Sequence, residues 1–71
     1  MDWDDLRVFL AVVRSESLSG AGRKLKIDPA TVGRRIARLE AAMGVRLFTK
    51  GPHGYAISEE GGRLLVHAEA V

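Results

Sequence analysis

The regular spacing of apolar residues between positions 28 and 43 predicts one amphipathic helix in the middle of the chain. At about 100° per residue, these apolar positions fall on one narrow face. They are Val32, Ile36, Leu39 and Met43. The positions expected to point outward are Ala30, Arg34 and Arg38, with Thr31 and Arg35 at the sides. Such a helix packs on one side and presents guanidinium groups on the other, which suits a nucleic-acid groove.

Start and stop signals set the ends of this helix. Asp28 is a good N-cap, because its carboxylate accepts hydrogen bonds from free N–H groups of the first turn. Pro29 suits the first helical position, where a missing N–H costs nothing. Gly44 follows Met43 and suits the left-handed conformation that ends many helices. The helix is therefore expected to span Asp28 to Met43.

An earlier helix is predicted from Trp3 to about Arg14, with Asp2 as its N-cap. Its apolar stripe is expected to face the core. That stripe comprises Leu6, Phe9, Leu10 and Val13. Val8 and Val12 lie on nearly the opposite side. Scattered surface valines are ordinary, but a second apolar stripe also fits a contact with another subunit.

A turn over residues 15–18 and a short helix over residues 20–26, capped by Ser19, are expected to lie between these helices. Ala21 and Leu25 are its expected inward-facing residues. Two helices joined by a tight turn, the second with an exposed polar face, form a helix-turn-helix pattern.

After Gly44 the pattern changes to two short strands, residues 45–50 and 55–57, joined by a turn rich in glycine and proline. A two-stranded hairpin is not stable alone, so part of it must pack on the helices. The residues expected to do so are Leu47, Phe48 and Ile57. Lys50 and His53 lie near the tip of this wing, where both can reach a phosphate or a minor groove.

Ser58 is expected to cap a last helix. One face of that helix comprises Leu64, Leu65, Ala68 and Val71. Val66 points elsewhere, so the helix is apolar on more than one side. The pattern is still running at Val71 without a C-cap signal, and we expect the natural protein to continue.

Composition and charge narrow the class of protein. A chain of 71 residues, 46% of them apolar and none of them cysteine, is at most one globular domain without disulfides, which agrees with a reducing cytosol. No apolar run is long enough to cross a membrane, and the acidic N-terminus argues against a signal peptide. Residues 23–53 carry a net charge of +6, and the flanking segments 1–22 and 54–71 carry −2 each. This distribution is typical of a protein that binds a polyanion, although on charge alone a solvated basic face is an equal alternative.

Three stretches share an ordered pattern with a known family: LRVFLAVVRSESLSGAGRKL, TVGRRIARLEAAMGVRLF and GYAISEEGGRLL. They make the chain resemble the N-terminal DNA-binding domain of LysR-type transcriptional regulators. The resemblance implies a mainly α, winged helix-turn-helix fold with three helices, a two-stranded β wing and the start of a linker helix. It assigns residues 1–58 to the DNA-binding domain and residues 59–71 to a linker helix that pairs with a second subunit.

The resemblance also implies partners. Such domains bind double-stranded DNA in the bacterial cytoplasm as homodimers or higher oligomers, with no membrane and no cofactor of their own. A large effector domain that takes a small-molecule inducer usually follows, and it is absent from this chain. This chain departs from the family in placing Pro29 before Ala30, where a polar residue usually precedes the proline, and in having Gly33 where serine is common. These departures affect particular base contacts.

Pattern and resemblance together give each candidate residue an expected role. Contacts to bases are expected from Ala30, Thr31 and Arg34. Contacts to phosphates are expected from Ser19, Arg35, Arg38, Lys50 and His53. A dimer interface is expected from Val8, Val12, Leu65 and Val66. Ordinary structural roles are the alternatives: an N-cap for Ser19, a turn residue for His53 and a solvated surface arginine for Arg34.

Other functions fit the sequence less well. No nucleophile and base occur at a recognisable spacing, and the chain is too short for a deep pocket, so we expect no enzyme activity. His67 has no companion ligand nearby, so no metal site is expected. The competing hypothesis is a winged-helix module that binds another protein, but such surfaces usually centre on aromatic residues, of which this chain has four.

Overall fold

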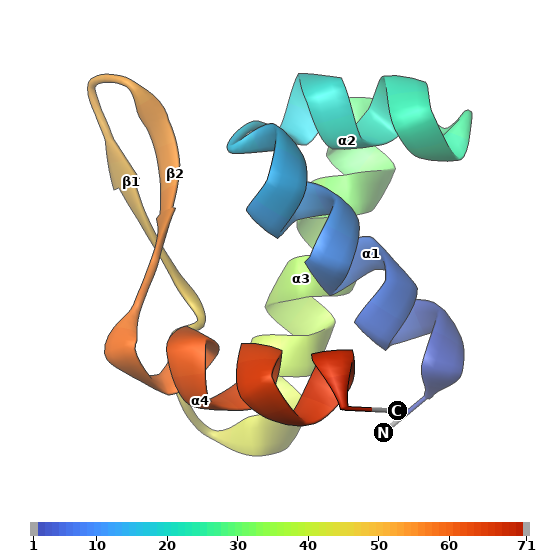
Figure 1. Ribbon diagram of the computed structural model, residues 1–71. Coiled ribbons are helices and arrows are strands. Elements are labelled where there is room, and N and C mark those ends of the chain that lie inside the picture. Colours follow the sequence, from blue (N-terminus) through green and yellow to red (C-terminus); the bar gives the residue numbers. More distant parts are fainter. Residues whose placement is uncertain (1, 71) are drawn as a thin grey trace.

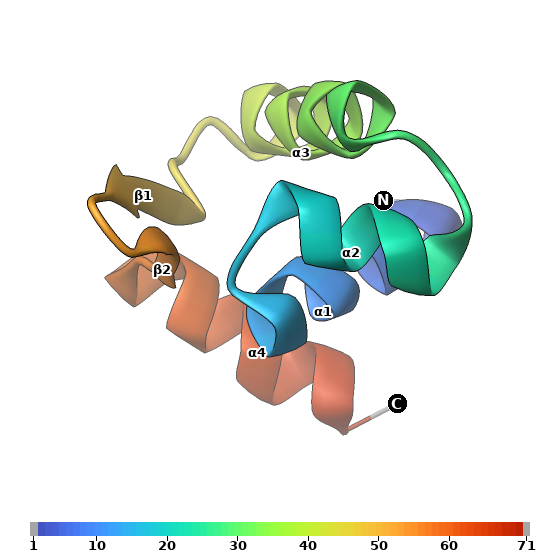
Figure 2. The ribbon, with the colours of Figure 1, turned by 90° about the horizontal axis from the view of Figure 1, so that it is seen from above.

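The computed structural model describes residues 2–70 and contains four helices and one two-stranded antiparallel sheet (Figure 1). In chain order the elements are α1 (Trp3–Ser15), α2 (Leu18–Leu25), α3 (Pro29–Met43), β1 (Phe48–Gly51), β2 (Gly54–Ile57) and α4 (Glu59–Glu69). The expected winged helix-turn-helix arrangement is confirmed. Seen from above, α3 lies along one side of the molecule, α4 lies along the opposite side, and α1 and α2 lie between them (Figure 2).

The core surrounds α1, which contacts α2, α3, β2 and α4. The largest fully buried side chains are Phe9, Leu39, Leu47, Val8, Val12 and Val32. Because other elements cover α1 on several sides, most of its circumference is apolar rather than one stripe. Leu6, Leu10 and Val13, expected as the core face, are only partly buried and pack at the edge of the core.

The expectation that Val8 and Val12 form a second, outward stripe is wrong. Both side chains are 0% exposed and belong to the core of this chain. Their side chains therefore have no surface to offer to a second subunit, and this part of the predicted dimer interface is corrected.

The start of the short second helix also differs from expectation. Ser17, not Ser19, is the N-cap: its Oγ accepts a hydrogen bond from the Gly20 N–H at 2.9 Å. Ser19 is instead an exposed residue of the first turn of α2. The ends of α3 are as predicted, with Asp28 as N-cap and Gly44 in the left-handed conformation at φ 71°.

The hairpin begins later than expected, at Phe48, because Leu47 before it bonds to α3 and to Ser58, the N-cap of α4, rather than to β2. The Leu47 N–H donates to the Glu40 carboxylate of α3 at 2.8 Å, and the Leu47 carbonyl accepts from the Ser58 N–H at 2.9 Å. Phe48 then pairs with Ile57, and Gly51 pairs with Gly54. These bonds fix the direction in which the wing leaves the helices.

Two further contacts attach the wing to α1. The Phe48 ring lies 5.4 Å from the Phe9 ring, measured between centroids. The Tyr55 N–H donates to the carbonyl of Glu16, just after α1, at 3.0 Å. Gly54 has φ 117°, and a Cβ there would overlap that same carbonyl, so this position requires glycine. Ile57, expected to pack on the helices, remains 38% exposed.

The last helix begins where predicted. Ser58 Oγ accepts from the Gly61 N–H at 2.9 Å, and Leu64 and Ala68 are buried against the body. Val66 is 68% exposed, as expected for a residue on another face. Val71, expected on the inner face, lies outside the described residues.

Adjacent glycines in α4 provide a test of this packing. A Cβ at Gly61 would overlap the Leu47 carbonyl, whereas a Cβ at Gly62 meets nothing within 4 Å. We expect Gly61→Ala to lower the free energy of unfolding by about 1–3 kcal/mol through overpacking. Gly62→Ala is the matched control, and we expect it to raise that energy by about 0.5–1 kcal/mol, since alanine favours helix. Urea denaturation measures both, and equal effects would contradict the close approach of α4 to Leu47.

Candidate nucleic-acid interface

The outer face of α3 lies at the surface along one side of the molecule (Figure 2). Val32, Ile36 and Leu39 are buried beneath it, which confirms three of the four predicted inward positions. Met43, the fourth, is 37% exposed and borders an open groove beside α4 rather than the core. Ala30 and Arg34 are exposed as predicted.

A chain of hydrogen bonds joins the candidate base-contacting residues to the cap of α3. The Thr31 hydroxyl donates to Asp28 Oδ1 at 2.6 Å, and the Thr31 N–H donates to Asp28 Oδ2 at 3.1 Å. Arg34 Nη2 in turn donates to the Thr31 hydroxyl oxygen at 3.0 Å. The bonds from Thr31, with the nearby Arg34 charge, hold the pKa of Asp28 below its usual range. Thr31 and Arg34 are thus oriented before any ligand arrives.

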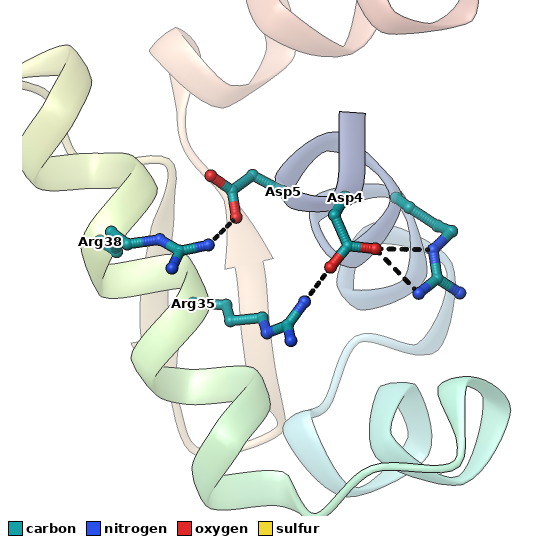
Figure 3. Close-up of polar contacts among 5 residues, drawn as sticks. Asp4, Asp5, Arg35 and Arg38 are labelled. Atoms are coloured by element: carbon teal, nitrogen blue, oxygen red, sulfur yellow. Dashed lines mark hydrogen bonds and ion pairs between the residues drawn. The ribbon is translucent and has the colours of Figure 1, made fainter. Parts of the chain in front are cut away.

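Arg35 and Arg38 take a different course, because their guanidinium groups turn toward the start of α1 (Figure 3). Arg35 Nη1 donates to Asp4 Oδ2, and Arg38 Nη2 donates to Asp5 Oδ1 at 2.5 Å. The Arg38 side chain is 61% exposed, as expected for an outward position, but its guanidinium group is paired with a carboxylate, as is that of Arg35. Among residues 2–70, Arg34 is the one arginine of α3 without an ion pair.

The two carboxylates lie in different surroundings. Asp5 is 8% exposed, and Arg38 supplies the opposite charge that a buried carboxylate needs. Asp4 is more exposed and accepts bonds from two arginines, Arg7 at 3.0 Å and Arg35. Those hydrogen bonds hold the pKa of Asp4 below its usual range, and the bond from Arg7 contributes most.

The remaining predicted phosphate contacts lie on two other elements. Ser19 is exposed in the first turn of α2, near backbone N–H groups that favour anions. Lys50 on β1 and His53 in the turn of the wing are both exposed. Lys50 also lines a cleft of about 240 Å³ between α3 and the hairpin, together with Arg46.

Arg46 is a candidate that the sequence analysis missed. It is exposed and borders the α3 face at Ala37 as well as the cleft beside the wing. The sequence did hold a signal for Arg46. It is a basic residue in the first predicted strand of the wing, close to the end of the predicted helix, and both the helix and the wing carry candidate DNA contacts.

The candidate dimer residues of α4 lie on the side of the molecule opposite α3 (Figure 2). Leu65 is half-buried and Val66 is exposed. Trp3, which was not among the predicted site residues, is 59% exposed at the start of α1. Because α4 lies on the opposite side of the molecule, it does not cover the outer face of α3.

Other classes of site find no support among residues 2–70. No three potential metal ligands of that range gather in one place, so His67 stands without companions. None of the helices there combines the length and the hydrophobicity needed to cross a bilayer.

Comparison with known proteins gives a consistent set of matches. The family model described as "Bacterial regulatory helix-turn-helix protein, lysR family" matches residues 3–62. The chain is 46% identical over 48 residues to the Mau operon transcriptional activator of Paracoccus denitrificans, covering 68% of this chain and 17% of that protein. It is 35% identical over 66 residues to a probable hydrogen peroxide-inducible genes activator of Mycobacterium avium, covering 93% and 21%. The chain spans about a fifth of the length of these curated relatives.

Solved structures resemble the whole described fold. The CbnR DBD–DNA complex matches with a TM-score of 0.93 at 26% identity, covering 99% of this chain and 80% of that one. The BenM DBD complex with catB site 1 DNA matches with a TM-score of 0.93 at 31% identity, covering 99% and 79%. These proteins are therefore similar to this chain over all six of its elements.

The lowered pKa of Asp4 predicts a loss of stability in acid. Its bonds to Arg7 and Arg35 contribute fully above the unfolded pKa of about 4. The contribution is lost as the pH falls through the lower folded pKa. We expect Asp4→Asn to flatten the dependence of unfolding free energy on pH below about pH 4 and to leave it unchanged at higher pH. The control is Glu69→Gln at the end of α4, and an unchanged pH dependence in Asp4→Asn would contradict the assignment.

Proposed function

Because the chain belongs to the lysR family of bacterial regulatory helix-turn-helix proteins, we propose that it binds double-stranded DNA sequence-specifically for a transcriptional regulator. The observation that carries the proposal is the exposed first half of α3, where Thr31 and Arg34 are held by the N-cap. The similarity to two solved protein–DNA complexes supports it. In this proposal α3 enters the major groove.

The base contacts come from the first turns of α3. Arg34 bonds through Nη2 alone in this structure, so its other N–H groups can meet a guanine edge. The Thr31 methyl group suits the methyl group of thymine. Its hydroxyl proton is donated to Asp28, so the hydroxyl oxygen can accept from a base, and it meets a phosphate only when that bond is exchanged. Ala30 offers only an apolar contact. Gly33 has no side chain, and a Cβ there would lie 3.3 Å from Leu18 of α2, so its small size favours the packing of α3 on α2.

The phosphate contacts come from both sides of α3. Ser19 at the start of α2 offers its hydroxyl and backbone N–H groups to one strand. Lys50 and His53 place the wing on the backbone or in the minor groove. We add Arg46, which lies between α3 and the wing. Contacts on both flanks fix the register of α3 on the duplex.

The whole regulator acts as a homodimer or higher oligomer in this proposal. Leu65 and Val66 of α4 supply the interface, on the side away from α3. A symmetric dimer reads two half-sites about 34–36 Å apart, or a multiple of that distance. The protein works in the bacterial cytoplasm and has no enzymatic role. A small-molecule inducer, where one acts, binds a separate effector domain.

Loss of the Arg34 side chain tests the base contact. We expect Arg34→Ala to weaken specific binding by about 1–3 kcal/mol and to relax preference at one base position, because one edge contact is removed. Competition binding with a set of single-base variants of a selected duplex measures this. Arg63→Ala on α4 is the matched control and should leave the preference unchanged. An equal loss on every sequence would show that Arg34 contacts only a phosphate.

A charge at Val66 tests the dimer. We expect Val66→Asp to convert the dimer to a monomer in sedimentation and to abolish joint occupancy of two half-sites in footprinting. Affinity for one isolated half-site should stay within about twofold of the wild type, because α4 lies away from the bound face. Normal sedimentation of Val66→Asp would remove Val66 from the interface.

Binding to a protein partner with no duplex affinity would favour the alternative, an interaction module.

A further inference from the structure

We propose that Asp4 and Asp5 of α1 are positioning residues that withhold Arg35 and Arg38 from DNA phosphates. The inference rests on the proposed function, since it concerns which cations of α3 act on the duplex. If these pairs persist on DNA, α3 presents less positive charge to the duplex than its three arginines alone would give. Binding to arbitrary DNA is weakened, and Arg34 carries a larger share of the recognition.

The geometry shows two ion pairs side by side between α1 and α3 (Figure 3). One joins Arg38 of α3 to Asp5, and the other joins Arg35 to Asp4. Arg7 closes the second pair on its far side, 3.0 Å from the other carboxylate oxygen of Asp4. Two consecutive carboxylates of α1 therefore face two arginines that lie almost one turn apart on α3.

Burial explains why the pair with Asp5 persists when a phosphate approaches. The Asp5 side chain is only 10% exposed, so release of Arg38 would leave a buried, unpaired carboxylate. The phosphates of DNA, in contrast, are well solvated before contact and lose less than Asp5 does when they remain without Arg38. The approach of DNA therefore does not readily separate this pair.

The exposed part of Arg38 does not change this conclusion. Its side chain is 61% exposed, and its remaining N–H groups can still touch a phosphate. A paired guanidinium, however, adds no net positive charge at that place. Since salt dependence reports the cations that replace counterions on DNA, a neutral pair contributes little to it.

The second pair, between Asp4 and Arg35, has a less buried carboxylate than the first. Asp4 is 39% exposed in its side chain and retains Arg7 if Arg35 leaves. Arg35 is thus the more easily released of the two arginines. The Asp5–Arg38 pair therefore gives the cleaner test, and the Asp4–Arg35 pair is measured second.

The experiment measures the slope of log affinity against log salt on a random-sequence duplex for the intact chain. We expect Asp5→Asn to steepen the slope by about 0.9 for each copy bound, because one guanidinium becomes available to a phosphate. Asp5→Asn/Arg38→Gln removes both charges and should restore the wild-type slope. Asp4→Asn and Asp4→Asn/Arg35→Gln repeat the comparison for the second pair.

Two controls separate this effect from a general change in charge. Glu69→Gln alters the net charge equally, but on α4, and should leave the slope unchanged. Lys50→Gln removes a proposed phosphate contact and should flatten the slope by about 0.9. Circular dichroism confirms that each variant is folded.

Two results would overturn the inference while leaving the proposed function intact. One is an unchanged slope in Asp5→Asn. The other is a slope for Asp5→Asn/Arg38→Gln that is flatter than the wild type by about 0.9, since Arg38 would then contact a phosphate despite its pair. The comparison of Asp5→Asn/Arg38→Gln with the wild type does not require Asp5→Asn alone. It therefore tests the inference even where Asp5→Asn folds poorly. A wild type that does not bind the duplex at all would overturn both proposals.

Discussion

Burial of one aliphatic face of α3 against α1 is the constraint on which the rest of the structure depends. Val32 and Leu39 are essentially inaccessible, and they belong to the same buried cluster as Phe9 and Val12 of α1. Once that face is buried, the helical period leaves Arg34 no direction except outward. The candidate interface is thus a consequence of packing, because the same residues that stabilise the fold also orient the face proposed to meet DNA.

Local signals account for most of what could be predicted from the sequence. The cap at Asp28, the stop at Gly44 and the cap at Ser58 are each set by residues within a few positions, and all are confirmed. The extent of α1 is confirmed, but the choice of its core face was wrong for a physical reason: a helix covered by several neighbours has no single apolar stripe. Its valines therefore looked like a second surface, although they are core.

The candidate site divides in the same way. Asp28, Thr31 and Arg34 are spaced three residues apart, so the hydrogen bonds between them form at the start of one helix. The pairs of Arg35 and Arg38 join residues more than thirty positions apart. A periodicity argument places these arginines on a face but has no information about what lies across from it. The acidic N-terminus appeared as a separate charged segment, when in the fold it neutralises part of the basic centre.

The most direct test of the account is a map of backbone amide shifts by NMR during titration with a duplex selected from a random pool. We expect the largest shifts on the first turns of α3, the start of α2 and the wing at Lys50 and His53. Shifts concentrated on α4 and the start of α1, with the first half of α3 unaffected, would contradict it.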